Sequence, residues 1–556
     1  MSKFKALFPL SLILVIAMVG SSYWFNQKQQ IDHFAQQISS IAISKNKVVD
    51  PKDLISMERD RITLQNTLNS SVLQFISGSL FFITAYIAWL NLIASEKKQI
   101  AERFAKAVDQ IGNDKLEVRV GGIFALEQIA LSSPEDHWTV MEVLTSFIRD
   151  QSLKGKSVFK PDSQIQEDLD TLEIAKLKTM EQAAIKVTAD IQAALTVICR
   201  RNTNQDPKGR IIDLSHCDLR GANLKNANLS NSDLRYTQIS NKSDLKNANL
   251  SNANLQGIDL TSSFLNGANL YKSNLNNAVI KYANLQNADL QDTDLTNVEF
   301  HHSNFRDAKL NRAKLYFTNF AEAQLQGANL KEAKLKLTNL RGAGIDAHTK
   351  IEEKWRRVHE INIDACKDKK LDGFDFSEAV LSCANFEGAS LKKANFNGAD
   401  LGSAKFKGAN LEGASFCKTD ITLMPNLDMA DFGESNLEGA IFIEASLQCT
   451  NFMGLTRKTN LSNVTFQQVN LASAIFQMVI LKKAKFINSF LQETDFSDAD
   501  ITEGTFDNCY YIERSIFAQT DLNKAVFIGH LGSADFRNSK HQNANFQNAD
   551  KSAAQF

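Results

Sequence analysis

The sequence predicts a mainly β fold, a solenoid whose chain turns a corner every five residues. Leu224, Leu229 and Leu234 lie five residues apart, and each follows Asn or Asp with a small residue before that. An α-helix would scatter these leucines around its axis, and a straight strand would alternate them between two faces. Only a chain that keeps turning in the same sense brings them all to one interior, so the fixed repeat indicates a solenoid.

The five-residue period can be followed over most of the chain. It starts at Leu214, restarts at Leu371, slips near 422–427 and 453–461, and becomes irregular after Phe506. In the second part the central residue alternates between Leu and Phe. Because an even number of corners per turn would align like residues, the alternation predicts separate stacked columns of Phe and of Leu. The residue two before each centre is usually Ala, which predicts a second inward position with little room.

The phrase ANLKN at residues 222–226, repeated dozens of times with small variations, resembles the pentapeptide-repeat family. The resemblance implies a right-handed quadrilateral β-helix with about twenty residues per coil. Two blocks, 211–345 and 371–556, would then form about sixteen coils and, at one strand spacing per coil, a rod of about 75 Å.

Two apolar stretches without a charged residue, 6–25 and 72–94, precede the repeats. Each is long enough to cross a bilayer as an α-helix. They predict a membrane anchor over 1–95 with two transmembrane helices and 26–71 as the connecting loop. The first stretch follows two lysines and could instead be a cleaved signal peptide.

Both alternatives give the same orientation. Lys3 and Lys5 precede the first stretch and Lys97 and Lys98 follow the second, and positively charged flanks favour the cytoplasmic side. We therefore expect an integral protein of the cytoplasmic or thylakoid membrane, with its repeats on the cytoplasmic side.

Residues 96–200 are expected to form an α-helical juxtamembrane domain. Ile100, Phe104, Val108 and Ile111 share one helical face. The following stretch VRVGGIFALEQI resembles a helix of a HEAT-type repeat, and the whole region is similar to the juxtamembrane part of membrane-bound bacterial pentapeptide-repeat proteins, notably cyanobacterial ones. The polar residues 151–181 are expected to be an exposed insertion.

The five-residue period is interrupted at 346–370. Trp355, Val358 and Ile361 lie on one helical face there. We predict a short helical connector that covers the joint between the two blocks; the alternative is an exposed recognition helix.

No catalytic, cofactor-binding or metal site is predicted, and the protein is expected not to be an enzyme. The chain has no P-loop, HExxH or GxSxG sequence. Adjacent histidines at His301 and His302 would point apart, and His137 stands where a helix is expected to begin. Gly121 and Gly122 suit close helix packing better than a phosphate loop, since no Lys followed by Ser or Thr comes after them. Seven dispersed cysteines without a CxxC pair indicate a reducing compartment.

The leading hypothesis for function is a membrane-anchored scaffold whose rod binds other proteins in the cytoplasm, with partners that the sequence does not identify. A rod of repeats offers much surface and no cleft. Some soluble members of the family regulate DNA-processing enzymes by mimicking DNA, but those are strongly acidic, whereas this chain has a net charge of −1. No nucleic-acid binding is expected. A further alternative is an accessory protein of a membrane sensing or transport system.

The last coil carries one more expectation. Phe546 and Phe556 keep a ten-residue phase to the last residue. Some family members dimerise through their C-terminal ends, and the end of a β-helix exposes an unpaired strand edge. The sequence therefore predicts either a homodimer through the C-terminal coil or a frayed last coil.

Overall fold

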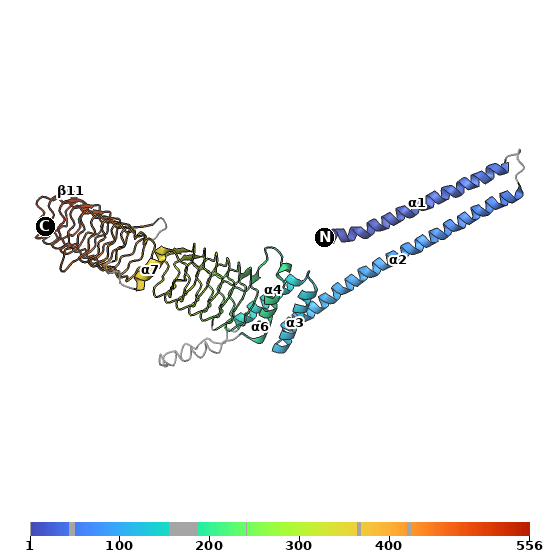
Figure 1. Ribbon diagram of the computed structural model, residues 1–556, viewed down its shortest axis with the longest axis horizontal. Coiled ribbons are helices and arrows are strands. Elements are labelled where there is room, and N and C mark those ends of the chain that lie inside the picture. Colours follow the sequence, from blue (N-terminus) through green and yellow to red (C-terminus); the bar gives the residue numbers. More distant parts are fainter. Residues whose placement is uncertain (1, 44–49, 155–186, 241, 364–368, 420–423) are drawn as a thin grey trace. The chain divides into compact units, whose positions relative to one another are not determined.

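The computed structural model describes residues 2–43, 50–154, 187–240, 242–363, 369–419 and 424–556, with side chains of α1 from residue 18 and of α4 up to residue 152. The chain forms two compact units, Met1–Lys106 and Ala107–Phe556. The helices are α1 (Ser2–Ile43), α2 (Pro51–Ile111), α3 (Leu116–Ser132), α4 (His137–Lys154), α6 (Ala189–Arg200), the 3₁₀ helix η2 (Thr203–Gln205) and α7 (Glu353–Ile363) (Figure 1). The strands are β1 (Ile212–Asp213), β2 (Ser232–Asp233), β3 (Lys314–Tyr316), β4 (Lys334–Lys336), β5 (Ser415–Cys417), β6 (Ile441–Ile443), β7 (Thr465–Gln467), β8 (Lys485–Ile487), β9 (Thr505–Asp507), β10 (Val526–His530) and β11 (Asn545–Asp550).

The first unit is a long antiparallel hairpin of α1 and most of α2, which lie side by side (Figure 1). Ile31 and Leu68 are its buried side chains among the described residues. The less exposed positions recur every three or four residues, which is the spacing of a coiled-coil seam. They are Gln27, Ile31, Phe34, Ile38 and Ile41 on α1, and Leu54, Met57, Arg61, Leu64 and Leu68 on α2.

This hairpin corrects the expectation of a connecting loop over 26–71. The described residues of that range are helical apart from Asp50. The physical reason is the seam, because apolar residues at heptad spacing allow two helices to bury them against each other. The boundary expected at residue 95 is also absent, since α2 continues unbroken to Ile111.

One helix among the described residues is long and apolar enough to cross a membrane. It is α2, which contains the predicted span 72–94, and its large apolar side chains there are exposed, including Leu80, Phe81 and Leu92. The other predicted span, 6–25, is helical, but the structure describes its side chains only from residue 18. A second transmembrane helix therefore stays a prediction.

The second unit begins with a small helical module of the last turns of α2 together with α3, α4 and α6. Its core contains Ile123, Leu126, Leu144 and Leu195, all fully buried. At Gly122 a Cβ atom would lie 2.9 Å from the carbonyl oxygen of Ala107, so the absence of a side chain lets α3 approach α2. The expected packing role of the glycine pair is therefore confirmed for Gly122.

Helix α6 covers the first coil of the solenoid. The side chain of Gln192 accepts the backbone N–H of Asn223 and donates to its carbonyl oxygen, both at 2.8 Å. The carbonyl oxygen of Cys199 accepts the N–H of Asn228 at 3.2 Å. Backbone groups that have no preceding coil to pair with thus find partners in the helix.

Arg201, directly after α6, joins the helical module to the solenoid. Its guanidinium donates to the carbonyl oxygens of Asn228 at 2.7 Å and Ser230 at 3.3 Å. Nε binds Asp206 at 2.9 Å, and the other carboxylate oxygen of Asp206 lies 3.1 Å from Nε2 of His137. The side chain of Arg201 is 2% exposed, so these contacts form a buried network.

We expect Arg201→Ala to lower the free energy of unfolding by about 2 kcal/mol, because it leaves buried carbonyl groups and Asp206 without their donor. Arg210→Ala is the matched control, since Arg210 is 63% exposed and pairs with Glu142 at the surface. Its expected cost is below about 0.5 kcal/mol. Thermal unfolding of both variants checks this, and equal melting temperatures would contradict the assigned role of Arg201.

From residue 212 onward the chain forms a β-solenoid of about 16 turns. Each residue that bridges two coils pairs in parallel with a residue one turn later: Asn249 with Asn269, Asn254 with Asn274, Asp259 with Val279 and Phe264 with Asn284. Four such bridges, five residues apart, follow one another before the cycle repeats. Each turn therefore has four faces, and the expected four-sided solenoid is confirmed.

The Asn or Asp before each Leu closes a corner. Oδ1 of Asn249 accepts the N–H of Ser251 at 3.2 Å, and Oδ1 of Asp294 accepts that of Thr296 at 3.0 Å. This side-chain turn suits short polar residues. The amides also pair between coils, as where Nδ2 of Asn269 donates to Oδ1 of Asn249 at 3.3 Å.

The interior consists of columns, as the Leu/Phe alternation predicts. Phe386 and Phe406 stack with ring centroids 5.0 Å apart and planes 1° apart. Rings of the two Phe columns also meet edge to face, as Phe386 and Phe396 do at 5.8 Å. The stacking continues regularly beyond Phe506 to the last coil, so the irregularity expected there affects the corners and not the columns.

The ladder between coils continues past the extra residues of the second block. Asp400 pairs with Asn426 and Asn436 with Asn460, in place of partners twenty residues later. The interruption at 346–370 contains α7, whose Trp355, Val358 and Ile361 are buried. His359 on the same helix is also buried, its Nε2–H donates to the carbonyl oxygen of Ala343 at 2.5 Å, and burial lowers its pKa. Beside α7 the ladder resumes directly, since Leu337 N–H donates to the carbonyl oxygen of Glu378 at 2.7 Å.

Candidate functional site

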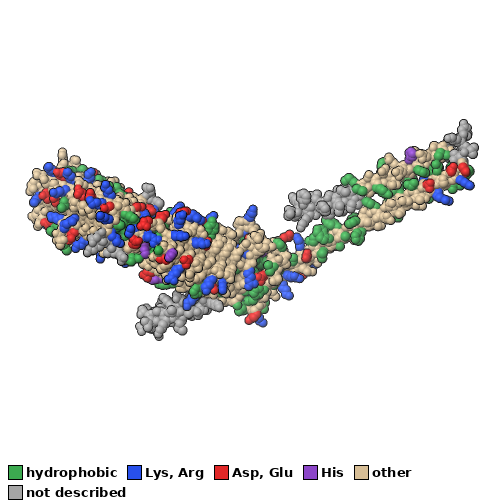
Figure 2. All heavy atoms as spheres, in the orientation of Figure 1, with side chains coloured by type: hydrophobic (Ala, Val, Ile, Leu, Met, Phe, Trp, Pro, Cys, Tyr) green, Lys and Arg blue, Asp and Glu red, His purple; other side chains and the backbone are tan. Residues whose placement is uncertain are grey.

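The outer faces of the solenoid carry charges of both signs that pair between neighbouring coils. Arg312 binds Asp292 at 2.8 Å and Lys392 binds Glu412 at 2.8 Å. On the face shown in Figure 2, basic and acidic side chains intermingle along the solenoid. That face has no continuous acidic stripe of the kind that DNA mimicry requires.

The adjacent histidines of the first block each have their own acidic neighbour. Nδ1 of His301 lies 3.2 Å from Glu299, and Nδ1 of His302 lies 3.2 Å from Glu322. His302 stacks on Tyr282 with centroids 5.0 Å apart. Within the described residues, no group of three or more His, Cys, Asp and Glu side chains is placed to hold a metal ion.

Cys199, Cys383, Cys449 and Cys509 differ in exposure. Cys509 is buried and Cys199 is half-buried, and burial raises the pKa of each thiol to about 12, which keeps both protonated at neutral pH. Cys383 and Cys449 are exposed on the solenoid.

Three exposed aromatic side chains form a patch on one side of the second block: Phe490, Tyr510 and Tyr511, with exposed fractions of 42%, 51% and 57%. The ring centroid of Phe490 lies 5.4 Å from that of Tyr510 and 5.7 Å from that of Tyr511. We call these three residues the aromatic patch. Clustered exposed aromatic residues are unusual on a surface that contacts only water.

The patch arises from one additional residue in the repeat. After Phe506 the next inward residue at the centre of a repeat is Ile512, 2% exposed, where the five-residue period would place residue 511. Tyr511 takes a backbone φ of 50° and turns outward instead. The same left-handed backbone recurs at corners along the solenoid, as at Tyr236, Tyr282 and Phe317, so what sets Tyr511 apart is its place beside Phe490 and Tyr510.

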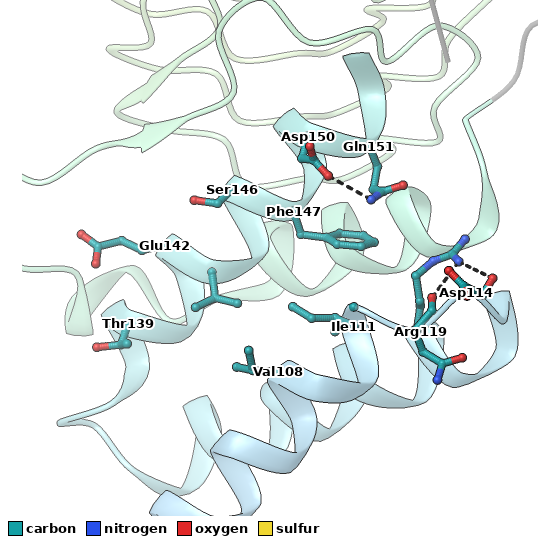
Figure 3. Close-up of a pocket in the computed structure, with 13 residues that line it drawn as sticks. Val108, Ile111, Asp114, Arg119, Thr139, Glu142, Ser146, Phe147, Asp150 and Gln151 are labelled. Carbon is teal, nitrogen blue, oxygen red and sulfur yellow. Dashed lines mark hydrogen bonds between the residues drawn. The ribbon is translucent and has the colours of Figure 1, made fainter. Parts of the chain in front are cut away.

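A groove lies in the helical module, between the last turns of α2 and helix α4 (Figure 3). Its volume is about 760 Å³. Val108 and Ile111 from α2 and Val143 and Phe147 from α4 form its apolar floor. We call it the α2–α4 groove.

The rim of the α2–α4 groove is polar. Asp114, Glu142 and Asp150 line it together with Thr139, Ser146, Gln151 and Arg119. Arg119 binds Asp190 at 2.6 Å. Burial would raise the pKa of Asp190, but hydrogen bonds from Thr188, Arg119 and the N–H of Ile191 outweigh it and hold the pKa below its usual value.

The sequence did not single out the aromatic patch, the α2–α4 groove or Arg201. The one signal for the patch was the six-residue spacing between Phe506 and Ile512, which is visible in the sequence. Nothing in the local sequence signals the groove, because it depends on how two helices from separate segments pack.

The model of pentapeptide repeats matches the chain in 8 copies, over residues 212–342, 370–422 and 426–454. A comparison with curated proteins found no significant match.

Several solved structures are similar. HetL, a pentapeptide repeat protein involved in heterocyst differentiation regulation from the cyanobacterium Nostoc, is 20% identical, and the match covers 49% of this chain and 89% of HetL with a TM-score of 0.17. Rfr23, a pentapeptide repeat protein from the cyanobacterium Cyanothece, is 35% identical over 20% of this chain and 64% of its own, with a TM-score of 0.13. QnrB1, a plasmid-mediated fluoroquinolone resistance protein, is 14% identical over 34% of this chain and 93% of its own, with a TM-score of 0.22.

Each of these TM-scores is below 0.5, so the superpositions carry no argument and the repeats themselves decide the assignment. Five-residue phrases fill four-sided turns with buried Leu or Phe at each centre, and the family model matches eight copies of them. Residues 212–342, 370–422 and 426–454 therefore consist of pentapeptide repeats, as the family model describes them.

Proposed function

We propose that this protein is a non-enzymatic, membrane-anchored scaffold whose solenoid binds other proteins. The aromatic patch carries the proposal. Tyr and Phe are enriched in the buried centres of protein interfaces, where one large, stiff side chain covers much area at little cost in conformational entropy. Around the patch the solenoid is a regular, flat-sided surface, which suits docking of a protein partner.

Paired charges between coils support protein binding over DNA mimicry. Pairs such as Arg514 with Glu493, 3.0 Å apart, place a cation beside an acid near the patch. A DNA mimic needs rows of unneutralised acids at the spacing of phosphates.

Proximity labelling from a C-terminal label in the native cell tests the proposal. The test variant combines Phe490→Ser, Tyr510→Ser and Tyr511→Ser. The control combines Tyr236→Ser and Tyr282→Ser, which also remove exposed aromatic side chains, 49% and 58% exposed, but from the first block. We expect a set of neighbouring proteins to disappear with the test variant and to remain with the control. Identical sets for wild type and both variants would contradict the assignment of the patch.

The exposed thiols of Cys383 and Cys449 can be labelled chemically to determine on which side of the membrane the solenoid lies. In sealed vesicles with the cytoplasmic face outward, we expect a membrane-impermeant maleimide to label both. A thiol introduced by Ser40→Cys, at an exposed position of the α1–α2 hairpin, should react only after detergent is added. The reverse pattern would place the solenoid on the opposite side, and labelling of all three without detergent would contradict a membrane-spanning anchor.

A further inference from the structure

We propose that the α2–α4 groove binds an amphipathic helix of a partner protein that carries Lys or Arg beside its apolar face. This site lies on the helical module, away from the aromatic patch of the solenoid. Its test is therefore independent of the test of the aromatic patch.

The size and floor of the groove suit a helix. Along α4 its lining runs from Thr139 to Gln151, a length of about 18 Å, or about three turns of a helix laid alongside. Both helices contribute apolar side chains to the floor: Val108 and Ile111 from α2, and Val143 and Phe147 from α4. An amphipathic helix presents apolar residues at positions i, i+3, i+4 and i+7, which matches a floor of this length.

The charges at the rim select a basic partner. Asp114, Glu142 and Asp150 are exposed, and they lie at the groove wall beside the apolar floor (Figure 3). The basic side chain that lines the groove, Arg119, is engaged by Asp190. Glu142 accepts from Trp138 Nε1 at 2.7 Å and pairs with Arg210 at 3.1 Å, contacts at the surface that a partner cation can share or replace. Asp150 accepts from Nε2 of Gln151 at 3.1 Å. With three carboxylates and one guanidinium among its lining residues, the groove has a negative formal charge.

The same charges argue against an anionic ligand. A phospholipid surface with acidic headgroups or a nucleic acid would be repelled by three carboxylates at the rim. A protein helix with Lys or Arg on the flanks of its apolar stripe satisfies both the floor and the rim.

Two labelled synthetic peptides of fourteen residues serve as probes. Both place Leu at the i, i+3, i+4 and i+7 positions; one has Lys and the other Glu at all remaining positions. Binding to the full chain in a non-ionic detergent is followed by fluorescence anisotropy. We expect the Lys peptide to bind and the Glu peptide to bind at least tenfold more weakly. The double variant Glu142→Lys with Asp150→Lys should weaken the Lys peptide about tenfold or more and strengthen the Glu peptide, because attraction becomes repulsion at two positions.

The matched control is Glu117→Lys, a charge reversal at an exposed position of the same helical module outside the groove lining. It should leave both affinities within about twofold. A photo-crosslinker attached through Ser146→Cys, at the exposed side of the groove, should capture the Lys peptide, whereas one attached through Glu117→Cys should not.

The proposal is overturned if the Lys peptide binds the wild type and the Glu142/Asp150 variant equally. Equal crosslinking from positions 146 and 117, or failure of both peptides to bind, would overturn it too. Capture of anionic vesicles from position 146 in preference to the Lys peptide would assign the groove to a membrane surface and overturn it as well.

Discussion

Leu285→Lys is expected to lower the free energy of unfolding of the surrounding coils by about 4 kcal/mol or more. Leu285 is fully buried, and its neighbours in the column, Leu265 and Phe305, are fully buried too. An ammonium group placed there has no acidic partner and no water. Because each coil contacts only its neighbours, the damage should be local, and hydrogen exchange should show lost protection around residues 265–305.

Gln286→Lys introduces the same residue one position further along, on the outer face, where the side chain is partly exposed. Its expected effect on stability is within about 0.5 kcal/mol. A loss of protection as large as that of Leu285→Lys would show that the inward and outward positions are wrongly assigned.

Phe466→Ala is the second large effect, with an expected loss of about 3–5 kcal/mol. The ring of Phe466 stacks on Phe442 and Phe486, both with centroids 5.0 Å away, and meets Phe476 of the other Phe column edge to face at 5.8 Å. Removing the ring opens a cavity in its own Phe column and ends that ring's edge-to-face contact with the other column. Hydrogen exchange along the second block measures the result.

Phe490→Ala deletes the same ring from the outer face of the same block and is expected to cost less than about 1 kcal/mol. Loss of protection in the first block, far from either substitution, would contradict the expectation that coils respond only to their neighbours.

Repetition made the solenoid predictable. Three positions of the repeat recur dozens of times: the inward Leu or Phe, the small residue two positions before it, and the Asn or Asp at the corner. The period is therefore detectable even where single residues depart from it. The connector helix was predictable for a related reason, since Trp355, Val358 and Ile361 mark a helical face within a stretch where the period fails.

Features that depend on a second segment were not predictable in this way. The seam of the α1–α2 hairpin does have a heptad signal, in Leu54, Met57 and Leu64, but polar residues around it suggested a loop. Arg201 stands in a polar stretch of the sequence with other charged residues, and only the fold shows that its guanidinium reaches the carbonyl groups of the first coil. The α2–α4 groove requires the packing of two helices and has no local pattern at all.

Four faces per turn give the solenoid a rotational register as well as a length. Deleting twenty residues removes one whole turn. Every later side chain then keeps its direction around the solenoid axis and moves only along that axis. Deleting five residues removes a quarter of a turn, and the aromatic patch then points about 90° away from its former direction relative to the helical module, with each inward residue still inward. The number of five-residue repeats, counted in groups of four, therefore sets the direction in which a bound partner faces. An insertion such as the one before Asn460 adds chain without changing that direction.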